Sequence, residues 1–108
     1  MSKLIISTQY CENYGSADEP YWKMKGGSEY AVLGLDFDAD YEWAEVRVDQ
    51  ILEQVRDQVE CDNPMCCEYI LGWEIVADDY LTQYERSQLE YDGKIDFPVK
   101  VVELKEIA

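Results

Sequence analysis

The chain has 108 residues, the size of one domain, and 47% of them are hydrophobic, as in globular proteins. It carries 24 acidic residues against 9 basic ones and no histidine, so its formal net charge at pH 7 is -15. This charge disfavours direct binding to nucleic acid or to an anionic membrane, because both attract basic surfaces. Without histidine, the most common general base and metal ligand is missing. We therefore expect a single domain over residues 1–108 that binds a basic protein, is not an enzyme and uses no cofactor.

The N-terminal segment has only three consecutive strongly apolar residues, from Leu4 to Ile6. A signal peptide needs an apolar run of about 7–15 residues, and a membrane-spanning helix needs about 20. We therefore expect a soluble, cytoplasmic protein whose cysteines are reduced thiols. A zinc site that uses all four thiols and a redox or intermolecular disulfide are the alternatives. The four cysteines are Cys11, Cys61, Cys66 and Cys67.

In chain order, the first predicted element is a strand over Lys3–Thr8, because a β-branched apolar run is bounded there by polar residues. Residues Gln9–Gly27 contain several turn signals and are expected to be irregular, with their aromatic residues packed on the body of the protein. The next predicted strand is Ser28–Leu35. Alternation divides its residues between two faces, with Tyr30, Val32 and Gly34 on one and Ala31, Leu33 and Leu35 on the other.

Residues Tyr41–Glu60 have the period of an amphipathic helix. Asp38 or Asp40 is the expected N-cap, and the Asp62-Asn63-Pro64 sequence is expected to end the helix. At about 100° per residue, six apolar side chains fall in one stripe that we expect to be buried. They are Ala44, Val48, Ile51, Leu52, Val55 and Val59.

A third strand is expected over Glu68–Ala77, with a bulge or a close backbone approach at Gly72. The sequence pattern of Asp79–Tyr91 fits either a helix or a strand. It favours a short second helix that stops at Asp92-Gly93. A last strand is expected over Phe97–Leu104. The predicted class is α+β: a mostly antiparallel sheet of about four strands, in the order ββαβ(α)β, with one long acidic amphipathic helix packed on a face.

Over half of the excess negative charge lies in residues 36–68, which carry 11 acids and 2 bases. Six of these carboxylates fall within about 120° of the helix surface, opposite the apolar stripe. Like charges four residues apart destabilise a helix by about 0.2–0.5 kcal/mol per pair, so the arrangement has a folding cost. The six residues are Glu42, Glu45, Asp49, Glu53, Asp57 and Glu60.

Two interpretations of this stripe remain open. It is either a solvated face that keeps the protein soluble, or a line of charges that imitates the phosphates of a nucleic acid. A carboxylate at every helical turn repeats at about 6 Å, against about 3.4 Å per phosphate along one DNA strand. The second interpretation predicts a basic nucleic-acid-binding protein as the partner and a salt-sensitive association.

The Asp36-Phe37-Asp38-Ala39-Asp40 segment begins like a calcium-binding loop, but Tyr41 and Arg47 occupy the positions where that loop needs glycine and glutamate. A metal-binding module or metal-dependent hydrolase that uses Asp36, Asp38 and Asp40 is therefore a lesser alternative.

The chain also has nine tyrosines and three tryptophans, more than a small core requires. Trp43, at the border of the acidic stripe, is an expected anchor for a partner, because aromatic residues are frequent binding hot spots. A homodimer or another assembly built on such aromatic residues is the remaining alternative.

The segment from Ile5 to Gly15, the Tyr21-Trp22-Lys23 sequence and the segment from Lys25 to Tyr30 resemble the opening of small accessory proteins of tailed bacteriophages. The resemblance covers about a quarter of the chain, which is shorter between Gly15 and Tyr21 than those proteins. It implies a phage protein in the bacterial cytoplasm and no particular activity. Small acidic phage proteins often inhibit host nucleic-acid machinery, so by this analogy we expect an inhibitor of the anti-CRISPR or anti-restriction type.

Overall fold

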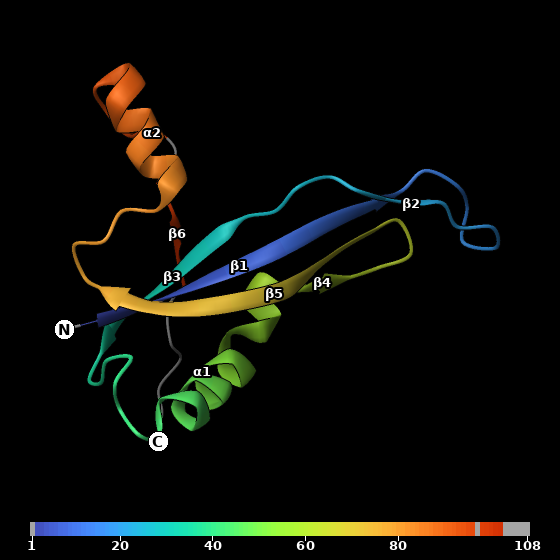
Figure 1. Cartoon of the computed structure of the whole chain (residues 1–108). Helices are drawn as coiled ribbons and strands as arrows, with labels where there is room; N and C mark the ends of the chain where they lie inside the picture. Colours follow the sequence, from blue (N-terminus) through green and yellow to red (C-terminus); the bar gives the residue numbers. More distant parts are fainter. Residues whose placement is uncertain (1, 97, 103–108) are drawn as a thin grey trace.

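The computed structural model describes residues 2–96 and 98–102, which form an α+β domain with a curled six-stranded sheet and two helices. The strands lie in the order β4-β5-β1-β3-β6, and β2 pairs separately with β1. All pairings are antiparallel except that of β3 with β6. The sheet is therefore mixed but mostly antiparallel, as expected. It has more strands than the four expected, and the order βββαββαβ replaces the predicted ββαβ(α)β. Figure 1 shows α1 across one face of the sheet and α2 beside β6.

Strand β1, Ser2–Asn13, is the centre of the sheet, and it is longer than the predicted strand. It pairs with β3 through its first half and with β5, Cys66–Ala77, along most of its length. The expectation of an irregular segment after Thr8 is therefore wrong as far as Asn13, and also at β2, Trp22–Met24. Pairing with these neighbours holds the polar residues of this segment in extended conformation.

The predicted strand before the helix is confirmed as β3, Glu29–Leu35, with Tyr30 and Val32 buried against the helix. Leu35 joins the same core, contrary to strict alternation. Gly34 has φ +75°, and the pairing of β1 with β3 shifts register between Ser2 and Leu4. The left-handed glycine and the register shift together turn Leu35 to the helix side.

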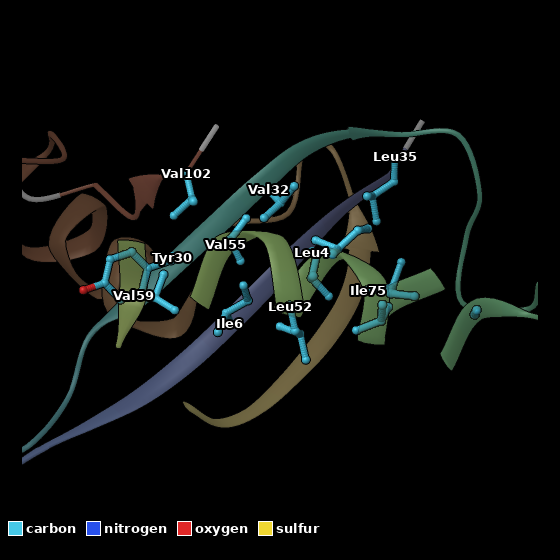
Figure 2. Close-up of a cluster of buried hydrophobic side chains, with 13 residues drawn as sticks. Leu4, Ile6, Tyr30, Val32, Leu35, Leu52, Val55, Val59, Ile75 and Val102 are labelled. Carbon is cyan, nitrogen blue, oxygen red and sulfur yellow. The ribbon is translucent and has the colours of Figure 1, made fainter. Parts of the chain in front are cut away.

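Helix α1 spans Ala44–Val59, and all six residues of the predicted apolar stripe are buried. Figure 2 shows side chains of this stripe packed against Leu4, Ile6 and Ile75 of the sheet. The predicted caps, Asp38 and Asp40, are wrong: Trp43 is the N-cap residue, and no side chain caps the helix there. A turn in which the Tyr41 N–H bonds the Asp38 carbonyl precedes the helix instead.

The second half of the chain contains β4, Cys61–Asp62, then β5, and then α2, Gln83–Asp92. The pairing of β1 with β5 shifts register at Leu71, directly beside Gly72, where an irregularity was expected. Helix α2 ends at Gly93 with φ +70°, as the Asp92-Gly93 sequence predicts. Of the predicted last strand, β6 covers only Lys100–Val101, and Phe97 and residues 103–104 lie outside the described residues.

Candidate functional site

The acidic face of α1 is the first candidate site, and four of its six expected members lie on the helix with exposed side chains. Successive members are four residues apart, so the four carboxylates extend over about 18 Å of the helix axis. The opposite side of α1 is anchored in the core, which fixes the direction in which this face points. We use the term acidic face for these four residues: Glu45, Asp49, Glu53 and Asp57.

The other two expected members do not belong to this face. Glu42 is exposed but precedes the first residue of α1. Glu60 is half-buried and follows the helix: its carboxylate accepts the Ile70 N–H at 3.0 Å and an ion pair from Arg56 Nε at 3.2 Å. Arg56 also lies 3.6 Å from Glu53, so it partly neutralises the C-terminal end of the face. Glu60 therefore holds β5 against the end of α1.

Trp43, the expected anchor residue, is 55% exposed at the N-terminal end of α1. Tyr41 and Val46 beside it in the sequence are also exposed, at 41% and 47%. An apolar surface of this kind next to carboxylates is typical of protein interfaces, where aromatic residues supply much of the binding energy.

The three aspartates before α1 line one depression together with an arginine. The Arg47 guanidinium lies 3.1 Å from Asp36 Oδ1 and 5.1 Å from the Phe37 ring centre, and the same side chain lines a depression with Asp38 and Asp40. A fixed positive charge at this position disfavours a cation there. Across the described ranges, no three His, Cys, Asp or Glu side chains are grouped to hold a metal ion.

The four thiols form two pairs on opposite faces of the sheet. Cys11 and Cys67 are direct cross-strand partners, whereas Cys61 and Cys66 lie around the hairpin between β4 and β5. The Asn63 amide, in the same hairpin, donates to Cys66 Sγ at 3.2 Å. Loss of solvent, followed by the effect of a neighbouring thiol, raises the pKa of Cys61 and of Cys67. Both therefore stay protonated at neutral pH, which disfavours nucleophilic chemistry.

A second depression, of about 510 Å³, lies between β3 and the start of α2 and contains two glutamates that the sequence did not single out. Glu85 accepts the Thr82 N–H through Oε1 and the Val99 N–H through Oε2. Burial raises the pKa of Glu85, but these hydrogen bonds outweigh it and lower the pKa below its ordinary value. Burial and the charge of Glu85 raise the pKa of Glu29. Because both oxygens of Glu85 hold backbone groups, its role here is structural.

The outer edge of β5 is a feature that sequence reasoning missed. Strand β4 is its only partner on that side among residues 2–96 and 98–102, and β4 covers only Cys67 and Glu68. Leu71, beyond that pairing, is 61% exposed. The alternating apolar pattern predicts a strand, but the position of that strand in the sheet depends on contacts that no local pattern reveals.

Comparison with models of protein families, with curated proteins and with solved structures finds no match to this chain. Neither helix in the described part of the chain is long and apolar enough to cross a membrane.

Proposed function

We propose that the protein binds a basic, nucleic-acid-binding protein of a bacterial host and blocks the groove in which that protein holds nucleic acid. The acidic face of α1 imitates the phosphates, and Trp43 with its apolar neighbours packs against the rim of the groove. An inhibitor of a restriction enzyme or of a CRISPR effector fits this description. The resemblance of the first quarter of the chain to phage accessory proteins agrees with this context.

One observation carries the proposal. Four exposed carboxylates repeat at every turn of a helix whose other side is fixed in the core. Of the two arginines on this helix, Arg47 pairs with Asp36 outside the acidic face, and Arg56 lies beside Glu53 at its C-terminal end. Charges held in a fixed row attract a basic groove from a distance and orient the protein as it binds. A row of like charges also destabilises its own helix, and binding is a physical reason for keeping it.

The test is capture of partners from a nuclease-treated bacterial lysate on the immobilised protein, at low and at high ionic strength. We expect a nucleic-acid-binding protein to be retained at low ionic strength and released at high ionic strength. Short duplex DNA or RNA added at low ionic strength should release the same protein, because it competes for the same groove. Retention that neither salt nor nucleic acid reduces would contradict the proposal, as would an empty column at low ionic strength.

A further inference from the structure

Within residues 2–96 and 98–102, no strand pairs with the outer edge of β5 from Leu71 to Val76, and we call this stretch the open segment. On its N-terminal side, β4 pairs with Cys67 and Glu68, and the Ile70 N–H bonds the Glu60 carboxylate. On its C-terminal side, the Ala77 carbonyl accepts the Tyr80 N–H at 3.0 Å. Figure 1 shows β5 near the outside of the sheet, between β1 and the short β4. The open segment thus lies between two ends that are already closed.

The backbone groups of Trp73 and Ile75 are the ones that face outward along this segment. The N–H groups of Thr8 and Tyr10 on β1 point away from β5, to Ser28 and Gly26. Ile6 and Leu4 are also even-numbered residues of β1, so their backbone N–H and C=O groups point the same way, away from β5. Ile6 faces Trp73 across the ladder, and Leu4 faces Ile75. In an antiparallel ladder, such pairs do not bond each other, and their polar groups point to the outer sides. Two residues therefore offer two donors and two acceptors to a further strand.

Apolar side chains flank these backbone groups. Leu71 is 61% exposed, and Trp73 is 37% exposed although it lies on the helix side of the sheet. Exposed backbone groups next to exposed apolar side chains form a template for strand addition, in which an extended segment supplies the missing hydrogen bonds.

Charge decides what kind of segment fits this edge. Residues 57–84 contain seven acidic residues and no lysine or arginine. Glu74 lies within the open segment, and Asp78 and Asp79 follow one end. Glu68 lies at the other end, together with Glu60, whose charge Arg56 offsets. A second copy of the chain has the same acidic edge and a net charge of -15, so self-pairing is opposed by repulsion. An extended segment rich in lysine or arginine is attracted instead.

We propose that the open edge of β5 binds an extended, basic segment of the partner protein as an added strand, with apolar side chains of that segment against Leu71 and Trp73. This inference rests on the proposed function in one respect: the proposed function supplies the partner protein and its positive charge. It adds a second contact that relies on backbone hydrogen bonds, in contrast to the charges of the acidic face.

The test uses a labelled eight-residue peptide of alternating lysine and valine, with blocked ends, and fluorescence anisotropy at low ionic strength. N-methylation of two neighbouring central residues blocks both edges of the peptide strand and leaves its charge unchanged. We expect this change to weaken binding about tenfold, because one methyl group always lies on the edge that meets β5, where it removes a backbone hydrogen bond and keeps the two strands apart. Equal binding of the methylated peptide would overturn strand addition. A peptide with glutamate in place of lysine should not bind, and its binding would overturn the preference for a basic segment.

A matched pair of protein variants locates the contact. Trp73→Pro removes an outward N–H that makes no bond to β1, whereas Trp73→Val retains it. We expect the proline variant to bind the peptide about tenfold more weakly than the valine variant. Equal affinity of two folded variants would contradict the inference. If the proline variant does not fold, the methylated peptide decides.

Sedimentation of the wild-type protein and of the two variants shows whether a second copy of the chain, in place of a basic segment, occupies the edge. A dimer that the valine variant forms and the proline variant does not would identify a second copy as the occupant and overturn the inference. Failure of the proposed function is distinguishable from these outcomes. Its test is lysate capture through the acidic face, whereas the methylated peptide tests only the edge.

Discussion

The substitution Asp49→Lys should stabilise the fold, because Asp49 lies at the centre of the acidic face. It is exposed and has a glutamate four residues away on each side, Glu45 and Glu53. Each such like-charge pair costs about 0.2–0.5 kcal/mol, and each opposite-charge pair contributes a similar amount. Exchanging two repulsions for two attractions should raise the free energy of unfolding by about 1 kcal/mol.

The assay is urea denaturation followed by far-ultraviolet circular dichroism, at low and at high ionic strength. Asp49→Gln is the control, since glutamine and lysine have similar helix propensities. Glutamine should give part of the gain, and the difference between the lysine and glutamine variants should shrink with added salt. If the lysine variant is no more stable than wild type at low ionic strength, repulsion among the carboxylates of the acidic face does not destabilise the fold, and the reasoning is refuted.

Four further predictions concern the fold and the thiols. Val55, fully buried under the sheet, should lose about 2 kcal/mol of unfolding free energy on substitution by alanine, whereas Val46→Ala on the exposed side should change it by less than about 0.5 kcal/mol; equal losses in urea denaturation would contradict the observed packing. Thr82 forms a capping box at the start of α2, so Thr82→Ala should cost about 1 kcal/mol, while Thr82→Ser should restore most of it in the same assay. Because the pKa of Glu85 is lower in the folded state than its ordinary value, its stabilising contribution is present above that value and is lost as pH falls through the lowered pKa. The stability difference between wild type and Glu85→Gln should therefore shrink on acidification, and a difference that stays constant down to low pH would be inconsistent with this shift. The raised pKa of Cys61 predicts slow alkylation by iodoacetamide at neutral pH, at a rate that still rises above the ordinary thiol pKa, and the profile of an unperturbed cysteine would disprove it.

The features that the sequence predicted correctly are local ones. The apolar stripe of α1 follows from a period of 3.6 residues, and the stop at Gly93 follows from the tolerance of glycine for a left-handed conformation. Both depend on residues within a few turns of each other, so a single segment contains the necessary information.

The features that it missed depend on distant partners. Gln9 to Asn13 are extended because β5 and β2 pair with them, although their polar side chains are poor strand signals. Glu60 belongs to the acidic stripe by angle alone, but its carboxylate turns inward because the Ile70 N–H lies within reach. The open edge of β5 likewise depends on the order of strands. Candidate sites based on helical angle thus needed correction wherever a tertiary contact competes for the same side chain.

The most direct test of the central claim compares two triple charge reversals in the lysate capture experiment. One changes Asp49, Glu53 and Asp57 to lysine on the acidic face. The other makes the same change in net charge at Asp18, Glu19 and Glu90, which are exposed elsewhere on the protein. If the acidic face binds the partner, the first variant loses the protein that wild type retains, and the second keeps it. Equal retention by both variants would show that net charge alone, or another surface, is responsible, and it would contradict the account.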